Sequence, residues 1–503
     1  MILSQQNLHL VNKDNVVIPK AKSLELPEKV LQFGTGVLLR GLPDYFINKA
    51  NQQGVFNGRV AVVKSTNGTT SEFDLQNCLY TLCVRGLENG ELVKKNIISS
   101  AISRVIAADH DWINVLAIAE SKDLKIIISN TTEVGIILVN ESIDQNPPSS
   151  FPAKVLAVLY QRFKAFKGSK ESGLIIIATE LIPDNGTKLA SIILQLAQFN
   201  QLEASFVAWL SKTNTFCNSL VDRIVPGRPD EATLAQLEQE LGYTDHLLSM
   251  TEPYRLWAIE GDEKVKEVLD FAKVDANVII AKDIEVYRAL KVRLLNGTHT
   301  LSSGIAFLLG IDTVKNAMQN EQVKNYIETL MASEISPAIP YVVTYKQTSD
   351  FSKAVLDRFA NPSIEHLWHN ITFQYTMKMK IRILPVLVNH YALYGNLPRH
   401  IVLGFAAYLV FMNVEKLENG KYYGSLNGNS YLINDDSAEY FFKQRAKNAN
   451  NYVINVLGDA DFWKLDLNLM NGFVESVDEK YNSIVSEGME VALQKLTTSA
   501  NLI

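Results

Sequence analysis

Short apolar runs alternate with longer segments of helical periodicity through the first half of the chain. The runs are rich in Val and Ile and have few polar positions, a pattern typical of strands buried on both faces of a sheet. The segments between them repeat apolar residues every three or four positions, which predicts amphipathic helices. This alternation predicts an α/β fold with a parallel sheet. The predicted strands are residues 30–33, 59–63, 124–128 and 174–177, and the predicted helices include residues 111–120 and 152–166.

After about residue 280 the apolar runs lengthen to helical size, and β-branched clusters become sparse. The most apolar run, residues 401–412, is about a dozen residues long and falls short of the roughly 20 that cross a bilayer, so it predicts a buried helix. No repeat or low-complexity linker separates the halves, which predicts two packed domains with a binding cleft between them. The predicted helices of the second half are residues 299–309, 313–333, 351–360, 382–393 and 400–413.

Composition narrows the class of protein. The 503 residues are 47% hydrophobic and 20% charged, so the chain can bury large cores. The formal net charge is −6 and no long run of Lys and Arg occurs, so nucleic acid is not an expected partner. Three cysteines, Cys78, Cys83 and Cys217, are too few for a disulfide framework and lack the spacing of a zinc site. With no secretory signal in sight, we expect a metal-free protein of the reducing cytoplasm that does not bind a membrane.

A glycine-rich turn follows the first predicted strand. Gly34 and Gly36 stand where a buried strand turns into a helix, so backbone N–H groups and the positive helix end can receive a pyrophosphate. Leu39 replaces the third glycine of the GxGxxG fingerprint, which leaves a purely structural turn as the alternative. The next strand follows at the interval of a βαβ unit, and this favours a dinucleotide. Lys64 ends that strand in place of the acidic residue that reads the ribose of NAD, so NAD and NADP both stay open.

A polar trio, Lys291, Asn296 and His299, lies near the junction of the two halves. On a continuous helix the three side chains fall within an arc of about 140°, at roughly 100° per residue, and face one side. The trio suits the interconversion of a carbonyl and an alcohol, with lysine transferring the proton, the asparagine amide stabilising the alkoxide and the imidazole holding a neighbouring hydroxyl. Acid–base work near neutral pH requires a lowered lysine pKa, for which Arg293 and nearby apolar residues are candidates. The alternative is a surface lysine, a capping asparagine and a core histidine.

Four motifs, taken in chain order, resemble the signatures of the mannitol dehydrogenase family of polyol-specific dehydrogenases. The likeness spans nearly the whole chain. It implies an NAD-dependent oxidoreductase acting on CH–OH groups, with a Rossmann-type dinucleotide-binding domain at residues 1–278, a mostly α-helical substrate and catalytic domain at residues 279–503, and no metal. The motifs are Gln-Phe-Gly-Thr-Gly at residues 32–36, Leu-Val-Asp-Arg-Ile-Val-Pro at residues 220–226, the Lys291 trio, and Lys-Met-Lys-Ile-Arg-Ile-Leu-Pro at residues 378–385.

The same resemblance implies roles for individual residues. Lys291 is the expected acid and base, while Asn296 and His299 polarise and position the substrate. The cofactor is NAD, with NADP as the alternative. The residues expected to hold it are Val30, Leu31, Gln32, Phe33, Gly34, Thr35, Gly36, Val37, Leu38, Leu39, Arg40 and Gly41.

Two departures from the family pattern point to a sugar acid as the substrate. Leu181 stands where mannitol-oxidising members have a second asparagine, and Asn370 stands where they have an arginine. A uronate or its aldonate carries a carboxylate, and Lys378 and Arg382 are the residues expected to bind it. Lys380, between them, is equally well explained as an exposed basic position.

Other interpretations stay open at two levels. Within the family, the chain can be a reductase of another hexuronate or a mannitol-type dehydrogenase. From another class, it can be a catalytically inactive dinucleotide-binding protein, although a complete Lys–Asn–His trio argues against a protein that needs no proton donor. Asp222 and Arg223 are expected to form a buried ion pair that stabilises the domain. The sequence does not predict an oligomeric state.

Overall fold

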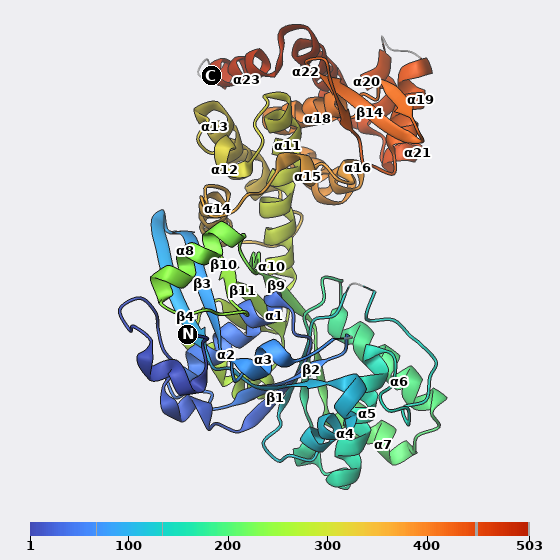
Figure 1. The fold of residues 1–503 in the computed structure, drawn as a ribbon. Helices are drawn as coiled ribbons and strands as arrows, with labels where there is room; N and C mark the ends of the chain where they lie inside the picture. The colour runs from blue at the N-terminus through green and yellow to red at the C-terminus, as the bar shows by residue number, and fades with distance from the viewer. Residues whose placement is uncertain (67, 133, 448–450, 501–503) are drawn as a thin grey trace. The chain divides into compact units, whose positions relative to one another are not determined.

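The chain folds into two compact units (Figure 1). The computed structural model describes residues 1–66, 68–132, 134–447 and 451–500. The first unit comprises Met1–Arg85 and Leu92–Ile284, and the second comprises Gly86–Glu91 and Glu285–Ile503.

A six-stranded parallel sheet forms the centre of the first unit. Its order is β5–β2–β1–β6–β7–β8, so the chain winds outward from β1 in both directions, as in a Rossmann fold. Gln32 in β1 pairs with Val62 on one side and with Ile128 on the other. The prediction of an α/β fold with a parallel sheet is confirmed, and all four predicted strands are present. The strands are β1 (Glu28–Phe33), β2 (Arg59–Lys64), β5 (Ile102–Ala107), β6 (Ile126–Ser129), β7 (Ile175–Ala178) and β8 (Thr215–Cys217).

Helices cover both faces of this sheet because successive strand residues point to opposite sides. Leu31 and Ile127 pack into a core with α4, α5, α6 and α7, which Figure 1 shows gathered on one side of β1 and β2. Val30 and Ile126 pack into the other core, with α2 and with Trp257. The helices of this unit are α1 (Val37–Gly41), α2 (Pro43–Gln52), α3 (Ser71–Leu75), α4 (Ala108–Ala119), α5 (Phe151–Ala165), α6 (Asn185–Phe199), α7 (Ala204–Thr213), α8 (Glu231–Leu241) and α9 (Glu263–Val268).

Two smaller sheets complete the first unit. One has the strand order β10–β3–β4, and the other has the order β12–β11–β9. The tip of the β3–β4 hairpin, Gly86–Glu91, belongs to the second unit. The strands are β3 (Tyr80–Glu88), β4 (Glu91–Ser99), β9 (Ser219–Asp222), β10 (Ser249–Thr251), β11 (Leu256–Glu260) and β12 (Val278–Ala281).

The second unit is mostly α-helical, as predicted. Helix α18 contains nearly all of the apolar run predicted to be buried, and it packs against α11 and α22 with most of its residues buried. No helix within the described ranges has both the length and the apolar character that crossing a membrane requires. The α-helices are α10 (Glu285–Leu290), α11 (Thr298–Leu308), α12 (Val314–Ala317), α13 (Glu321–Thr329), α14 (Tyr345–Phe359), α15 (Trp368–Ile371), α16 (Tyr375–Lys378), α17 (Leu384–Tyr394), α18 (Arg399–Phe411), α19 (Ala438–Lys447), α20 (Tyr452–Leu457), α21 (Ala460–Trp463), α22 (Phe473–Glu487) and α23 (Met489–Ala500), and three segments are π-helical: η5 (Lys291–Gly297), η6 (Leu330–Ile335) and η8 (Met379–Ile383).

The prediction of a single helix over residues 313–333 was wrong, because the segment forms α12, α13 and η6 instead. The Thr313 side chain accepts a hydrogen bond from the N–H of Asn316 at the start of α12. Asn320 accepts hydrogen bonds from two N–H groups in the first turn of α13. Each of these side chains begins a new helix, so the two N-caps divide a segment whose apolar pattern is continuous.

A small antiparallel sheet in the second unit was not predicted. It consists of β13 (Lys416–Glu418), β14 (Lys421–Leu426) and β15 (Asn429–Leu432). Asn427 and Gly428 join β14 to β15, with φ values of 53° and 77°. An Asn-Gly pair with both residues in the left-handed region is characteristic of a two-residue hairpin turn, so the sequence did carry a signal for this sheet.

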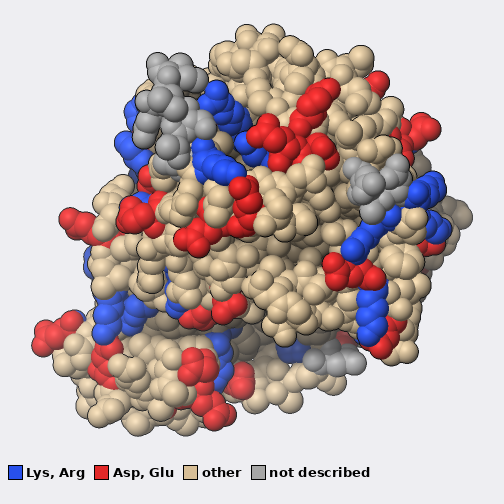
Figure 2. Space-filling model, turned by 90° about the horizontal axis from the view of Figure 1, so that it is seen from above, with Lys and Arg blue, Asp and Glu red and all other residues tan. Residues whose placement is uncertain are grey.

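The surface carries charges of both signs. On the face seen in Figure 2, Lys and Arg side chains lie among Asp and Glu, with wide uncharged areas between them. Cys78, Cys83 and Cys217 are buried free thiols. Among the residues that the structure describes, no group of three or more His, Cys, Asp or Glu side chains is placed to hold a metal ion.

Candidate active site

The turn after β1 requires glycine at its first position. Gly34 has a φ of +125°, which L side chains rarely adopt. A Cβ on this residue would lie 2.9 Å from Cδ1 of Leu39 and 3.0 Å from the carbonyl oxygen of Asn130. Leu39, which replaces the third glycine of the fingerprint, therefore packs directly against the turn and leaves no room for a larger residue at position 34.

Gly36 faces open space. A Cβ on Gly36 would have no atom within 4 Å, so its backbone can be approached closely by a ligand. The helix that starts here is short, because Pro43 disfavours a helical Leu42 and separates α1 from α2. The expected attraction of a pyrophosphate by the positive helix end therefore comes from a helix of five residues. The open space at Gly36 is the feature that suits a pyrophosphate.

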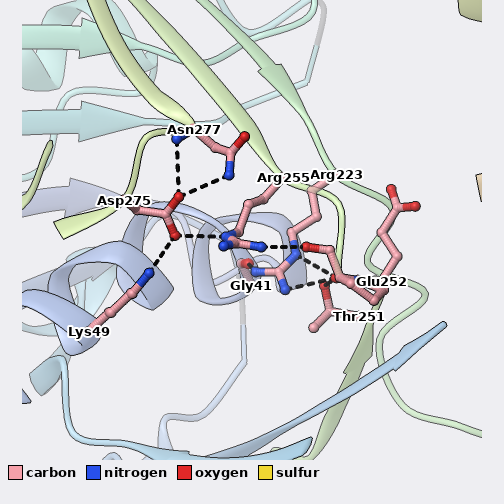
Figure 3. Close-up of polar contacts among 9 residues, drawn as sticks. Gly41, Lys49, Arg223, Thr251, Glu252, Arg255, Asp275 and Asn277 are labelled. Carbon is pink, nitrogen blue, oxygen red and sulfur yellow. Dashed lines mark hydrogen bonds and ion pairs between the residues drawn. The ribbon is translucent and has the colours of Figure 1, made fainter. Parts of the chain in front are cut away.

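The Val-Asp-Arg-Ile-Val motif supports this turn at its far end. A Cβ on Gly41 would lie 2.8 Å from Cγ2 of Val225, so the end of α1 packs on the motif through a glycine. Nη1 of Arg223 donates to the Gly41 carbonyl at 2.6 Å, and Nε and Nη2 donate to the Glu252 carbonyl at 3.0 and 2.8 Å (Figure 3). The motif thus anchors the last residue of the predicted dinucleotide-binding segment.

Arg223 is buried among polar and aromatic groups. Its guanidinium lies 4.5 Å from the centre of the Tyr45 ring. Burial lowers the pKa of Arg223 to about 10, which still leaves the side chain charged at neutral pH. In Figure 3 Arg255 lies beside it and is directed to Asp275, whose carboxylate accepts from Nε of Arg255 at 2.8 Å. Asp222 is buried in the same motif, and its ion pair with Arg223 stays a prediction.

A pocket of about 690 Å³ lies at the carboxyl end of β5, beside the segment that follows β2. Ligands of parallel sheets bind at such strand ends. Lys64, the last residue of β2, donates to the carbonyl and hydroxyl oxygens of Thr66 at 2.7 and 3.0 Å, so its ammonium group is held by the adjoining loop. The acidic side chains that line the pocket are Asp74 and Asp111.

A buried carboxylate ties together the carboxyl ends of β6 and β7. Glu180 accepts from the N–H and hydroxyl of Thr131 at 2.9 and 3.1 Å and from the Ser129 hydroxyl at 3.2 Å. It thereby orders the loop whose Asn130 carbonyl packs against the glycine turn. The sequence did not single out Glu180, because nothing in its spacing distinguishes it from a surface carboxylate. Leu181, which follows it, is 60% exposed and supplies no amide.

Lys291 and Asn296 lie on the π-helix η5, between α10 and α11. The spacing of roughly 100° per residue used to place the trio on one face applies to an α-helix, so that derivation was wrong for this segment. A π-helix bonds each N–H to the carbonyl five residues back. Lys291 and Asn296 are five residues apart, so the π-helix brings them onto one face more closely than an α-helix would. Short π-helical segments are frequent at functional sites.

Two arginines join η5 to the second π-helix of this region, η8. Arg293 Nη1 donates to the carbonyls of Ile381 and Arg382, the latter at 2.8 Å. Arg382 Nη1 donates in return to the Thr300 hydroxyl at 3.1 Å and to the Asn296 carbonyl at 3.4 Å. Burial lowers the pKa of Arg293, and it lowers the pKa of Arg382 to about 10. Arg382 is thus held beside the residue expected to stabilise the alkoxide.

His299 lies among aromatic rings with one ring nitrogen unpaired. Its imidazole stacks on Phe359, with ring centres 4.1 Å apart and planes 14° apart. It meets His366 and Trp368 edge-on, at 5.1 and 5.9 Å between ring centres. Within the described part of the chain, Nε2 of His299 is shielded from solvent and has no hydrogen-bond partner. Burial, reinforced by nearby basic groups, holds the pKa of His299 well below its usual value, so a neutral ring is available to a ligand hydroxyl.

Lys378 and Lys380 have different environments. Lys378 Nζ donates to the Ile371 carbonyl at 2.8 Å, and burial together with the charge of Arg382 lowers the pKa of Lys378 to about 8. Lys380 Nζ lies 3.7 Å from the centre of the Phe462 ring, a cation–π contact that leaves Lys380 half-buried rather than exposed. Of the two lysines, Lys378 is the one that belongs with the polar cluster around His299.

Four of the predicted residues of the second unit lie close together: Asn296, His299, Lys378 and Arg382. Arg382 bonds to Asn296, and the charges of Lys378 and Arg382 both act on His299. Two basic side chains that the sequence did not single out, Arg358 and His366, also act on His299. They come from α14 and from the loop before α15, and no sequence spacing links them to His299. Asn370, at the position of the family arginine, is exposed.

Both units match domains of known proteins. Residues 28–273 match the mannitol dehydrogenase Rossmann domain, and residues 283–485 match the mannitol dehydrogenase C-terminal domain. The altronate oxidoreductase of Bacillus subtilis (strain 168) is 37% identical over 477 residues, which cover 94% of this chain and 95% of that protein. The altronate oxidoreductase of Halalkalibacterium halodurans is 34% identical over 495 residues, 96% of each chain.

Two solved structures share the fold. Mannitol 2-dehydrogenase of Pseudomonas fluorescens, solved as a ternary complex with NAD and D-mannitol, superposes with a TM-score of 0.68 at 20% identity and covers 99% of this chain and 100% of that one. A substrate-free D-sorbitol dehydrogenase superposes with a TM-score of 0.81 at 18% identity, over 98% and 100% of the two chains.

Proposed function

This chain belongs to the mannitol dehydrogenase family, and we propose that it catalyses the altronate oxidoreductase reaction, the reversible NAD-dependent reduction of D-tagaturonate to D-altronate in hexuronate breakdown. The observation that carries this proposal is the similarity, over nearly the full length of both chains, to several curated altronate oxidoreductases. The departures at Leu181 and Asn370 agree with it, because both positions differ from those of mannitol-oxidising relatives.

The glycine turn of the first unit fits a dinucleotide. Gly34 is confined to a conformation that only glycine adopts readily, and Gly36 leaves open space where a side chain would otherwise stand. The segment from Val30 to Gly41 holds the pyrophosphate, and the pocket at the end of β5 accommodates the adenosine end. When bound, NADH supplies the hydride that reduces the keto carbon.

Gly36→Val is expected to weaken NADH binding by about tenfold or more, because the branched side chain occupies the space that the pyrophosphate needs. The fold should be unaffected, since Gly36 has φ −61° and ψ 153° and no atom stands within 4 Å of its Cβ position. Protein fluorescence quenching by NADH gives the dissociation constant, and thermal unfolding checks the fold. Gly36→Ala serves as a graded control with a smaller loss. Unchanged NADH affinity in both variants would remove Gly36 from the dinucleotide site.

The second unit supplies the acid–base chemistry. Lys291 donates a proton to the carbonyl oxygen as the keto carbon is reduced, and it takes the proton back from the alcohol in the reverse direction. The Asn296 amide donates to the same oxygen and stabilises its negative charge. His299, neutral and with an unpaired Nε2, orients a neighbouring hydroxyl. Lys378 and Arg382 bind the carboxylate, with Arg382 offering the fork that suits bidentate contact.

Comparison of three substrates tests this assignment. NADH oxidation is followed with D-tagaturonate, D-fructuronate and D-fructose under identical conditions. The value of kcat/KM should be highest for D-tagaturonate and lowest for D-fructose, which lacks the carboxylate. A preference for D-fructuronate or D-fructose would replace the assignment with that of another family member. Binding of NADH without turnover of any hexuronate would indicate a catalytically inactive dinucleotide-binding protein.

The two domains divide the work, with residues 1–278 holding the dinucleotide and residues 279–503 holding the substrate and the catalytic lysine. The site of action is the cytoplasm, where NADH is available. The three cysteines support this location, because buried free thiols are usual in a reducing compartment.

A further inference from the structure

We propose that His366, in the loop before α15, is a specificity-determining residue that joins Lys378 and Arg382 in binding the substrate's carboxylate. The inference rests on the proposed function and extends it, because it names a residue that separates acidic from neutral substrates. D-Tagaturonate has its keto group near one end of a six-carbon chain and its carboxylate at the other end. A site that selects it over a neutral ketose must therefore bind the carboxylate, at the end far from the reacting carbon.

The position of His366 beside His299 is the first argument. The two imidazoles meet edge-on, with 5.1 Å between ring centres and 77° between their planes. Phe359 covers the face of His299 and Trp368 meets its edge, so the ring is surrounded by apolar surface and by His366. Because the ring centres are 5.1 Å apart, His366 is within reach of a six-carbon substrate whose hydroxyl pairs with Nε2 of His299.

The charge around the two rings is the second argument. The pKa of His299 is lowered by His366, Arg358, Arg382 and Lys378. The pKa of His366 is lowered by Arg358 and Lys378. These groups lie on four parts of the unit: α14, α16, η8 and the loop itself. Their convergence gives this region a positive potential inside a chain whose formal net charge is −6. Such a region is suited to an anion.

Nearby carboxylates are committed elsewhere. Glu365, adjacent to His366 in the chain, pairs with Lys315. Asp435 raises the pKa of Lys378, but its oxygens accept the N–H groups of Thr376 and Ser437 at 2.7 and 2.8 Å. An incoming carboxylate therefore has cationic partners to pair with.

Binding of an anion next to His366 is linked to a proton. Burial and the neighbouring cations lower the pKa of His366 in the free protein, so the ring is neutral at pH 7. A bound carboxylate raises that pKa, so the complex binds more protons than the free enzyme does. Affinity for the acid is therefore greatest at low pH and weakens as the pH rises through the pKa of the complex. Arg382 stays charged throughout this range, and Lys378, with its pKa lowered to about 8, would weaken binding only at higher pH, so a dependence between pH 6 and 7 points to the histidine.

His366→Gln tests the proposal, with His369→Gln as the matched control because His369 is exposed and lies three residues away. We expect His366→Gln to raise the KM for D-tagaturonate about tenfold at pH 6.5, as for loss of one charge-assisted hydrogen bond, with little change in kcat. The dissociation constant of NADH and the weak activity toward D-fructose should stay within about twofold. The wild-type KM for D-tagaturonate should rise between pH 6 and 7, below the range in which Lys378 titrates, whereas the variant should show a flat profile there. The control should match the wild type throughout.

His366→Lys provides a second variant that keeps a positive charge. It should retain the preference for D-tagaturonate over D-fructose and lose the pH dependence of KM, which a merely structural histidine would not do. Dissociation constants for D-altronate and for its neutral hexitol, measured by calorimetry with NADH bound, give the same preference without turnover, so failure of the proposed reaction can be told from failure of this inference. Equal losses toward acidic and neutral ligands in His366→Gln, or an unchanged pH profile, would overturn the role of His366.

Discussion

Lys291→Ala is expected to lower kcat for D-tagaturonate reduction by about 10²- to 10⁴-fold, the usual contribution of a positioned general acid. Without the ammonium group, the oxygen of the keto group must acquire its proton from water while negative charge develops on it. The loss should fall on kcat and kcat/KM alike, because the proton is transferred only in the transition state. Steady-state rates of NADH oxidation measure both constants, and the dissociation constant of NADH should not change.

One further variant tests whether Lys291 acts by transferring a proton or only by its positive charge, and another serves as a control. Lys291→Arg keeps a cation but cannot release a proton near neutral pH, so it should be nearly as inactive as the alanine variant. Lys353→Ala, on the exposed surface of α14, should retain wild-type kcat. Turnover within about fivefold of the wild type in Lys291→Ala would assign the proton transfer to another group. Lys378, with its pKa lowered to about 8, would then be the first candidate.

The architecture of the first unit could be predicted because its strands are uniform apolar runs. A strand such as Ile175–Ala178 is buried on both faces, so every position is apolar and the pattern does not depend on orientation. The second unit was harder, because helix ends there are set by single polar side chains. Thr313 and Asn320 each begin a helix inside a continuous apolar pattern, and a periodicity argument does not detect them. The hairpin at Asn427-Gly428 had a signal in the sequence that was not used.

The candidate site likewise has residues that could be predicted from the sequence and features that could not. Lys291, Asn296 and His299 could be named from the sequence because they occupy one contiguous segment, although the π-helix that carries the first two could not. A π-helix differs from an α-helix in its backbone hydrogen bonds, which reach five residues back instead of four, and not in a residue pattern. Here Arg293 of η5 and Arg382 of η8 each donate to a carbonyl of the other π-helix. His366 reaches His299 only through tertiary packing, so no spacing in the sequence could reveal it.

Arg223→Met is expected to lower the free energy of unfolding of the first unit by roughly 2–4 kcal/mol, since each carbonyl left without a donor costs about 1–3 kcal/mol. The Gly41 carbonyl loses its Arg223 donor, the Glu252 carbonyl keeps only the Thr251 hydroxyl at 3.4 Å, and the contact with the Tyr45 ring is lost as well. Methionine has a similar apolar stem, so the change removes the guanidinium without opening a large cavity. Urea unfolding followed by tryptophan fluorescence measures the loss, and Arg228→Met is the control because Arg228 is exposed five residues away.

The same substitution tests whether the motif at residues 220–226 positions the glycine turn that binds the dinucleotide. Arg223 bonds to the Gly41 carbonyl at the end of α1, and Val225 packs where a Cβ of Gly41 would stand, so the glycine turn is held at one end by Leu39 and at the other by this motif. Arg223→Met should therefore weaken NADH binding even under conditions where the first unit stays folded. Arg223→Lys keeps the charge but cannot donate to both carbonyls from a planar fork, so its NADH affinity and stability should fall between those of Arg223→Met and the wild type. If Arg223→Met lost stability but bound NADH normally while folded, the motif would stabilise the domain without positioning the turn.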